Sequence, residues 1–236
     1  MSTIERAIQA IRDARPKRVV VFTGAGVSAD SGIPTFRGAG GLWRDFRAED
    51  LATPEAFRRD PKLVWEWYEW RRDLIRNAKP NAAHDAIARL AAPVVTQNVD
   101  GLHARAGSRD VIELHGNIFR ARCVREGTTS ERVDAFDEIP PHCACGALLR
   151  PDVVWFGEML PESAIARATT LIHATDLLLV IGTSGVVYPA AGLVGVCRGL
   201  TIEINPQVST ACAHAIEETA AIATSPIVEA ILEVQR

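Results

Sequence analysis

The chain has 236 residues, enough for one sizeable domain and a small satellite, with 47% hydrophobic and 23% charged residues. The net charge of −3 argues against a broad basic surface for nucleic acid, and no apolar run reaches the roughly 20 residues that cross a bilayer. The N-terminus lacks a basic segment followed by an apolar stretch, and the five cysteines are unevenly placed. We therefore expect a cytoplasmic protein with no secretion signal, which binds neither nucleic acid nor a membrane.

The first half of the chain alternates apolar strands with helices. Apolar residues at helical spacing predict a helix over residues 4–11, and an apolar strand over residues 19–22 follows it. Asp60 and Pro61 form an N-cap with proline at the first helical position, which predicts a helix over residues 61–76. The next predicted elements are a helix over 81–90 and strands over 94–96 and 111–114.

The segment 120–150 differs from the rest of the chain. It holds three cysteines and Pro140-Pro141 but no sustained apolar period, so we interpret it as an excursion from the main fold. Strand character returns over residues 153–157. The later predicted elements are helices over 163–174 and 189–198 and strands over 177–181 and 200–204.

This alternation of strand and helix predicts an α/β fold. We expect a doubly wound, Rossmann-like parallel sheet with a small inserted domain that is helical and zinc-ribbon-like. The expected Rossmann-like domain is discontinuous and comprises residues 1–40, 81–119 and 150–236. The expected small domain comprises a helical insertion over 41–80 and a cysteine-containing module over 120–149.

Several polar groups begin where an apolar run stops. In an open parallel sheet, ligands bind outside the carboxyl ends of the strands, so these groups should share one rim. The sequence therefore predicts a nucleotide-using active site at that rim. The polar groups that follow predicted strands are Gly24, Gly26, Gln97, Asn98, Asp100, His115, Gly182, Thr183, Ser184 and Asn205.

Residues 24–29 (GAGVSA) fit a dinucleotide-binding pattern after an apolar strand. A simple glycine-rich turn between a strand and a helix is the alternative. A dehydrogenase needs a second strand that ends in an acidic residue about 20 positions later. That region is a glycine-rich irregular loop over 32–41 followed by Trp43, so hydride transfer is disfavoured.

His115 is the candidate for proton transfer at neutral pH. A lone histidine at a strand end is more often a structural hydrogen-bonding group. Asn98 and Asp100, expected at the same rim, favour the catalytic interpretation. His103 falls on the helix that follows them, and we expect a structural role for it.

Tyr68 and Arg71 lie three residues apart on the predicted helix 61–76 and therefore share a face. A phenol beside a guanidinium can bind a carboxylate through charge-assisted hydrogen bonds. The residues alone favour the alternative, an aromatic packing stripe of Trp65, Trp67, Tyr68 and Trp70 with arginines in solvent.

Cys123, Cys143 and Cys145, with His142 adjacent, suggest a zinc module. Two C-x-x-C pairs would be a stronger pattern, whereas here Cys123 is followed three positions later by Glu126. A tetrahedral site from these residues and a metal-free relic both stay open.

Five motifs together resemble the sirtuin family, in the family's order and across nearly the whole chain. They are 24–37 (GAGVSADSGIPTFR), 96–103 (TQNVDGLH), 114–116 (LHG), 153–158 (VVWFGE) and 182–184 (GTS). Tyr68-x-x-Arg71, with residues 39–41 (AGG) and 50–54 (DLATP), resembles the class III branch. That branch removes succinyl, malonyl and glutaryl groups from lysine.

The resemblance implies an NAD-dependent protein-lysine deacylase, a desuccinylase and demalonylase that also removes acetyl groups. It would act on acylated-lysine proteins and release nicotinamide and 2′-O-acyl-ADP-ribose. His115 would be the general base toward the ribose hydroxyls, with Asn98 and Asp100 as catalytic partners. The resemblance implies NAD contacts at Gly24, Ala25, Gly26, Asp30, Phe36, Arg37, Trp43, Gln97, Asn98, Val99, Asp100, Gly182, Thr183, Ser184, Asn205, Pro206, Gln207 and Ala221.

The resemblance also implies the substrate contacts. Val154, Trp155 and Phe156 would pair with the substrate backbone as an added strand. Tyr68 and Arg71 would bind the distal carboxylate of the acyl chain.

The family's zinc is structural. Cys123 and Cys145 match its ligand positions and Cys143 supplies a third, but Glu126 stands where the family has cysteine.

Two other functions would use the same pocket: a non-catalytic NAD or ADP-ribose sensor, and a protein ADP-ribosyltransferase. The presence of His115, Asn98 and Asp100 favours the deacylase over the sensor. The short extensions at both ends lead us to expect a monomer.

Overall fold

The computed structural model describes residues 1–35, 46–208 and 212–236, and its largest element is a six-stranded parallel sheet. The strand order is β3-β2-β1-β7-β8-β9, so the order reverses between β1 and β7. In a doubly wound sheet the ligand crevice lies at such a reversal. The strands are β1 (Val19–Thr23), β2 (Val94–Thr96), β3 (Val111–Glu113), β7 (Leu177–Ile181), β8 (Leu200–Ile204) and β9 (His214–Ile216).

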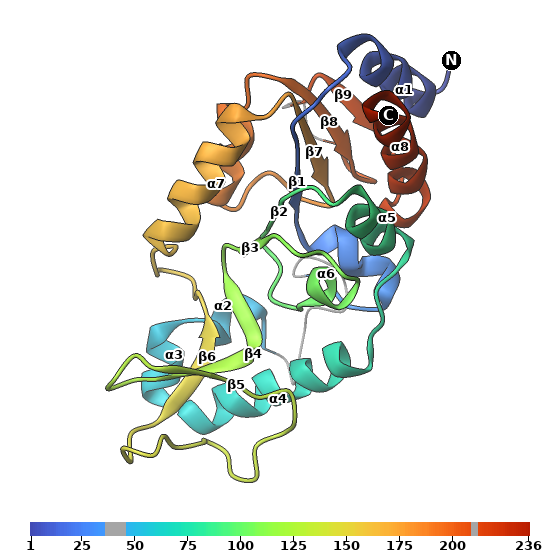
Figure 1. The fold of residues 1–236 in the computed structure, drawn as a ribbon. Helices are drawn as coiled ribbons and strands as arrows, with labels where there is room; N and C mark the ends of the chain where they lie inside the picture. The colour runs from blue at the N-terminus through green and yellow to red at the C-terminus, as the bar shows by residue number, and fades with distance from the viewer. Residues whose placement is uncertain (36–45, 209–211) are drawn as a thin grey trace.

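Helices cover both faces of this sheet (Figure 1). Val21 and Leu179 point into one apolar cluster, and their neighbours Phe22 and Val180 point into another on the opposite face. The helices of the first face are α1 (Thr3–Ala14), α5 (Ala82–Leu90) and α8 (Ala220–Gln235). Those of the second are α7 (Glu162–Ala174) and the 3-10 helix η2 (Ala190–Val196). The predicted doubly wound α/β fold is confirmed.

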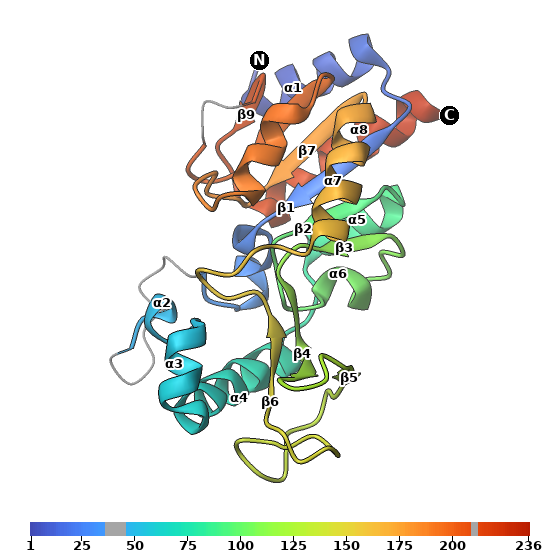
Figure 2. The same ribbon diagram turned by 90° about the vertical axis from the view of Figure 1, so that its left-hand side faces the viewer.

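A smaller antiparallel sheet lies beyond the carboxyl ends of β1 to β3 (Figure 2). Its strand order is β5-β4-β6. Its strands are β4 (Gly116–Cys123), β5 (Thr129–Glu131) and β6 (Leu149–Val153). A separate apolar cluster joins it to α2 (Ala48–Leu51), α3 (Pro54–Arg59) and α4 (Pro61–Asn77). Asp60 caps α4 as predicted, because its side chain accepts a hydrogen bond from the Leu63 N–H at 3.0 Å.

Two elements differ from the sequence prediction. The strand expected over 153–157 is wrong: β6 ends at Val153, and Gly157 with φ +85° lies in a turn. The apolar run there buries Trp155 in the second core instead of extending a strand. The helix expected over 189–198 is a shorter 3-10 helix, since Gly192 and Gly195 disfavour a regular α-helix.

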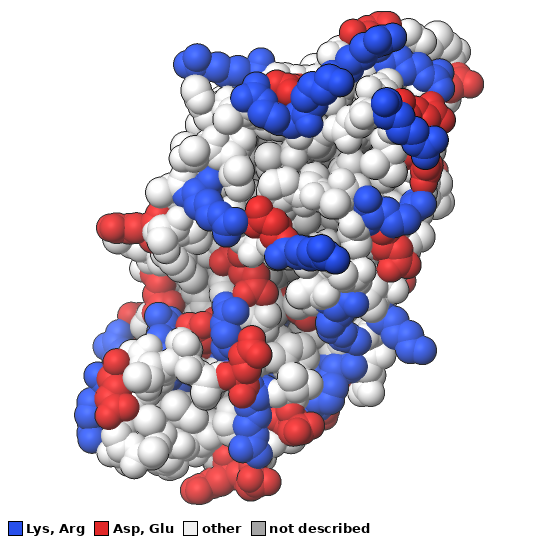
Figure 3. Space-filling model, in the orientation of Figure 1, with Lys and Arg blue, Asp and Glu red and all other residues white. Residues whose placement is uncertain are grey.

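Within the described ranges, no helix is long and apolar enough to cross a membrane. Basic and acidic side chains are interspersed on the face shown in Figure 3. Exposed ion pairs such as Arg89–Glu229, at 2.7 Å between α5 and α8, belong to this mixed surface.

Candidate active site

The glycine-rich loop packs directly against the end of β7. Gly26 N–H donates to the Gly182 carbonyl at 2.8 Å, and Gly24 N–H donates to the Ile181 carbonyl at 3.0 Å. Gly182 has φ +64°, and a Cβ built there would lie 2.3 Å from the Val27 nitrogen. No residue with a side chain fits this crossing. The loop continues as the 3-10 helix η1 (Ala25–Ser31), which places Ala25 and Gly26 at the rim.

Side chains tie the ends of β2, β7 and β8 together. Gln97 Nε2 donates to Thr183 Oγ1 at 3.0 Å, and Asn205 Nδ2 donates to the Thr183 carbonyl at 2.8 Å. Ser184, Pro206 and Gln207 are exposed beside these contacts. At the other end of the loop, Ala221 N–H lies 3.4 Å from Asp30 Oδ2.

Asn98 and Asp100 are buried and meet at Ser28. Ser28 Oγ donates to Asp100 Oδ2 at 2.7 Å and accepts from Asn98 Nδ2 at 3.1 Å. The Asp100 carboxylate also accepts from the Leu102 N–H at 2.9 Å, at the start of helix α6 (Leu102–Arg105). One hydroxyl therefore fixes both predicted catalytic side chains.

Two buried histidines lie behind this cluster. His84 Nε2 is 3.4 Å from Ser28 Oγ, and the His84 and His103 ring centroids are 4.9 Å apart. His103 Nε2 is 3.0 Å from Thr23 Oγ1. Burial lowers the pKa of His103 to about 3, with a further contribution from His84, so His103 is a neutral hydrogen-bonding group.

His115 follows β3 and is partly buried. Its Nδ1 lies 2.8 Å from the carbonyl oxygen of Gln97. A carbonyl only accepts, so Nδ1 carries the proton and Nε2 is the basic nitrogen. Burial lowers the pKa of His115, and the hydrogen bond to Gln97 opposes this shift. The imidazole is therefore neutral at physiological pH, as a general base requires.

A cavity at the rim brings Arg71 to the predicted catalytic residues. Its lining includes Ala25, Ser28, Arg71, Asn98, Val99 and Asp100. The Arg71 guanidinium lies 5.8 Å from the centroid of the Tyr68 ring, and Tyr68 is fully buried. Burial lowers the pKa of Arg71, while Tyr68 and Asp100 oppose that shift, and the guanidinium keeps its charge. Arg71 thus places a cation in this cavity.

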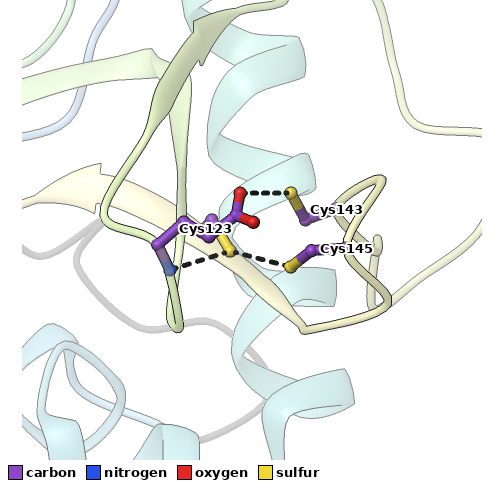
Figure 4. Close-up of side chains that lie close together, drawn as sticks. Cys123, Cys143 and Cys145 are labelled. Carbon is purple, nitrogen blue, oxygen red and sulfur yellow. Dashed lines mark hydrogen bonds between the residues drawn. The ribbon is translucent and has the colours of Figure 1, made fainter.

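Three thiols and a carboxylate converge in the small sheet (Figure 4). The Sγ atoms of Cys123 and Cys145 are 3.6 Å apart, and Cys143 Sγ lies 3.8 Å from Glu126 Oε2. All four ligand atoms lie within 4.8 Å of one another. Two sulfurs at about 2.3 Å from a tetrahedral zinc lie about 3.8 Å apart, and carboxylate oxygen is also a zinc ligand. The cluster could therefore hold a zinc ion that ties the turn before β6 to β4.

The structure adds residues to which sequence analysis gave no role. Ser28 lies within the glycine motif, but nothing in the motif shows that it contacts both Asn98 and Asp100. Arg150 and Glu158 contact Trp155, through a ring contact and a hydrogen bond respectively. Three predicted NAD contacts, Phe36, Arg37 and Trp43, lie outside the described residues.

The family follows from comparison with known proteins. The model of the family described as "Sir2 family" matches residues 24–189, more than half of the chain. The chain belongs to the Sir2 family. The predicted resemblance to the sirtuins is confirmed.

Relatives and solved structures match this Sir2 protein over most of its length. It is 56% identical over 205 residues to NAD-dependent protein deacylase 2 of Pyrobaculum aerophilum, across 83% of this chain and 82% of the relative. It is 49% identical over 237 residues to the NAD-dependent protein deacylase of Thermus thermophilus, across 94% and 92%. The crystal structure of a Sir2 homolog–NAD complex matches with a TM-score of 0.91 and 44% identity, across 98% and 95%. A Sir2–p53 peptide–NAD+ structure matches with a TM-score of 0.84 and 31% identity, across 94% and 97%.

Proposed function

We propose that this Sir2 protein is an NAD-dependent protein-lysine deacylase that releases nicotinamide and 2′-O-acyl-ADP-ribose. The proposal rests on Asn98 and Asp100, which line one cavity with Ala25 of the glycine loop, and on His115, whose Nδ1 contacts the Gln97 carbonyl next to Asn98. Relatives named NAD-dependent protein deacylase and Sir2 structures with NAD, 2′-O-acetyl-ADP-ribose and a p53 peptide support it.

Each part of the rim has a role in this reaction. When bound, NAD supplies the ribose carbon that receives the acyl oxygen, and nicotinamide as the leaving group. Gly24 and Gly26 let the loop pack against Gly182, which brings the start of η1 to the end of β7, where the phosphates would bind. Asn98 and Asp100 are pre-oriented by Ser28 to hold the nicotinamide side. His115 accepts a ribose hydroxyl proton at Nε2.

The remaining NAD contacts implied by the resemblance belong to this proposal. Gln97 and Thr183 already contact each other, and Asn205 contacts Thr183. Asp30 and Ala221 lie together at the start of α8. We assign the phosphates and riboses to the former group and the adenine to the latter. The further members are Gly182, Ser184, Pro206 and Gln207.

We propose that the acylated peptide binds along residues 154–156. The N–H groups of Val154, Trp155 and Phe156 already donate within the chain, to the His115 carbonyl, Glu158 and the Ala52 carbonyl. The Trp155 carbonyl also accepts within the chain, from the Glu158 N–H, so an added strand would use the carbonyl oxygens of Val154 and Phe156. Phe156 is 45% exposed, so its ring is accessible to a peptide.

We further propose that the acyl group carries a distal carboxylate, as succinyl and malonyl do. Among the described residues, Arg71 is the cation that lines the cavity, and its guanidinium lies 5.8 Å from the centroid of the Tyr68 ring. A guanidinium and a phenol together bind a carboxylate through charge-assisted hydrogen bonds. An acetyl group carries no carboxylate for this guanidinium but would still fit the same reaction.

The decisive experiment incubates the protein with NAD and acetyl-, succinyl- or malonyl-lysine peptides. Mass spectrometry should detect nicotinamide, free lysine peptide and acyl-ADP-ribose together. NAD binding without nicotinamide release would identify a sensor. Transfer of labelled ADP-ribose to protein would identify an ADP-ribosyltransferase.

The remaining expectations are also part of this proposal. We propose a cytoplasmic monomer that does not bind nucleic acid. We propose the domain division given above, in which residues 41–80 and 120–149 form the small domain. Size-exclusion chromatography with light scattering tests the oligomeric state, and limited proteolysis tests the domain division.

A further inference from the structure

Trp155 is held from three sides in a single orientation. The Arg150 guanidinium lies 3.5 Å from the centroid of the Trp155 ring. The Phe57 ring packs at a centroid distance of 5.3 Å. The Trp155 backbone N–H donates to Glu158 Oε2 at 2.9 Å. The tryptophan is only 3% exposed, so its side chain is surrounded by protein atoms and not by solvent.

Glu158 connects two of these contacts. Arg150 donates to both of its carboxylate oxygens, from Nη1 at 2.5 Å and from Nη2 at 2.9 Å, and Nη2 also donates to the Val153 carbonyl. A planar guanidinium held by a bidentate carboxylate presents a fixed flat face, which a lysine ammonium cannot do. That face stacks on the indole. The orientation of Trp155 therefore depends on the Arg150–Glu158 pair.

Trp155 contacts Tyr68 directly through its indole N–H. Its Nε1 donates to the Tyr68 hydroxyl oxygen at 2.9 Å, and both side chains are buried. An indole N–H only donates, so the phenol oxygen accepts and the phenol proton points elsewhere. Tyr68 lies beside Arg71, which lines the cavity. The Tyr68 side chain is itself fully buried, so we expect it to act on an acyl group in that cavity through its contact with Arg71.

We propose that Arg150 and Glu158 are positioning residues, which orient Trp155 and, through its indole N–H, hold Tyr68 in place beside Arg71, the residue that lines the cavity for the acyl group. The inference rests on the proposed function, and it adds two residues that act through Trp155.

The kinetic test is a double-mutant cycle with succinyl-lysine peptide at saturating NAD. Glu158→Gln and Arg150→Lys should each raise KM for the peptide about tenfold, as expected for one misplaced hydrogen bond to a charged group, with a smaller change in kcat. In a Tyr68→Phe background, Glu158→Gln should add less than about a twofold effect, because the hydroxyl that it positions is gone. Effects that multiply in the double variant would overturn the inference.

Glu229→Gln is the matched control, because it breaks the exposed pair with Arg89 and should leave KM unchanged. A second readout does not need activity. The chain is labelled with 5-fluorotryptophan, and the fluorine signal of Trp155 among the five tryptophans is assigned by its loss in Trp155→Phe. Glu158→Gln and Arg150→Lys should shift that signal, and Glu229→Gln should not. An unmoved signal overturns the inference, whereas a wild-type protein that releases no nicotinamide overturns the proposed function instead.

Discussion

His115 Nδ1 lies 2.8 Å from the carbonyl oxygen of Gln97. The backbone that follows β2 therefore sets the tautomer of the imidazole that follows β3. The side chain of Gln97 donates to Thr183 at the end of β7. The proposed general base and the predicted phosphate-binding side thus both contact Gln97.

The pH dependence of turnover follows from this geometry. Only neutral His115 can accept a proton, and burial lowers its pKa below the ordinary 6.5. We expect kcat/KM to fall with acid, with a midpoint below pH 6.5. A pH profile of kcat/KM measured with succinyl peptide checks this. A midpoint at or above 6.5 would show that burial does not control the base.

Removal of the imidazole should separate catalysis from binding. His115→Ala should abolish turnover and leave the affinity for NAD within about threefold of the wild type, because the ring acts in proton transfer. Isothermal titration calorimetry measures the affinity. A large loss of NAD binding would make His115 a binding residue.

Arg71→Leu should distinguish between acyl groups. A charged hydrogen bond to a carboxylate contributes about 1.5–3 kcal/mol, so desuccinylation should fall about tenfold or more in kcat/KM. Deacetylation should change much less, because an acetyl group carries no charge for the guanidinium. Equal losses with the two peptides would refute the carboxylate clamp.

A methyl group added at Gly182, where the glycine loop packs against the end of β7, should lower the free energy of unfolding. In Gly182→Ala the new Cβ would lie 2.3 Å from the Val27 nitrogen at φ +64°, and we expect the free energy of unfolding to fall by about 3 kcal/mol. NAD binding should be lost with it. Gly195→Ala is the matched control, since no atom lies within 4 Å of its added Cβ. Urea denaturation of both variants measures the difference.

The carboxylate of Glu126 should contribute to metal binding. Glu126→Ala should lower zinc affinity about tenfold or more, because a tetrahedral site loses one of its four ligands. Competition with a chromophoric chelator measures the affinity, and Glu131→Ala on exposed β5 is the control. Cobalt substitution reports thiolate coordination directly. Unchanged affinity in Glu126→Ala would exclude the carboxylate as a ligand.

Acid should destabilise the fold through His103. Its pKa is about 3 when folded and ordinarily 6.5, so the unfolded chain binds the proton more readily. The contribution of neutral His103 to the free energy of unfolding is fully present above pH 6.5 and is lost as the pH falls from 6.5 toward 3. At pH 5 the loss is about 2 kcal/mol, at about 1.4 kcal/mol per pH unit.

Urea denaturation at pH 7 and pH 5 measures the effect of His103. The difference should shrink in His103→Asn and persist in His173→Asn, since His173 is exposed. The same pH dependence in all three proteins would locate the destabilising proton elsewhere.

Local signals in the sequence were sufficient to predict the parallel sheet, helix α4 and the family. Apolar runs predicted β1, β7 and β8, and Asp60 with Pro61 predicted the start of α4. Each of these signals needs only a few adjacent residues, because burial and capping act over one strand or one helical turn. Polar groups at strand ends also predicted a site at the carboxyl edge of the sheet, where Asn98 and Asp100 line a cavity.

Contacts between distant residues required the tertiary structure. Trp155 meets Tyr68 across 87 positions, Cys123 meets Cys145 across 22, and Ser28 meets Asp100 across 72. The pattern of apolar residues shows that a side chain is buried but does not name its partner, because partners depend on how elements distant in sequence pack together. For the same reason the apolar run after Val153 was predicted to be a strand. In the structure its Trp155 packs against α3 and Arg150 and belongs to the second apolar cluster.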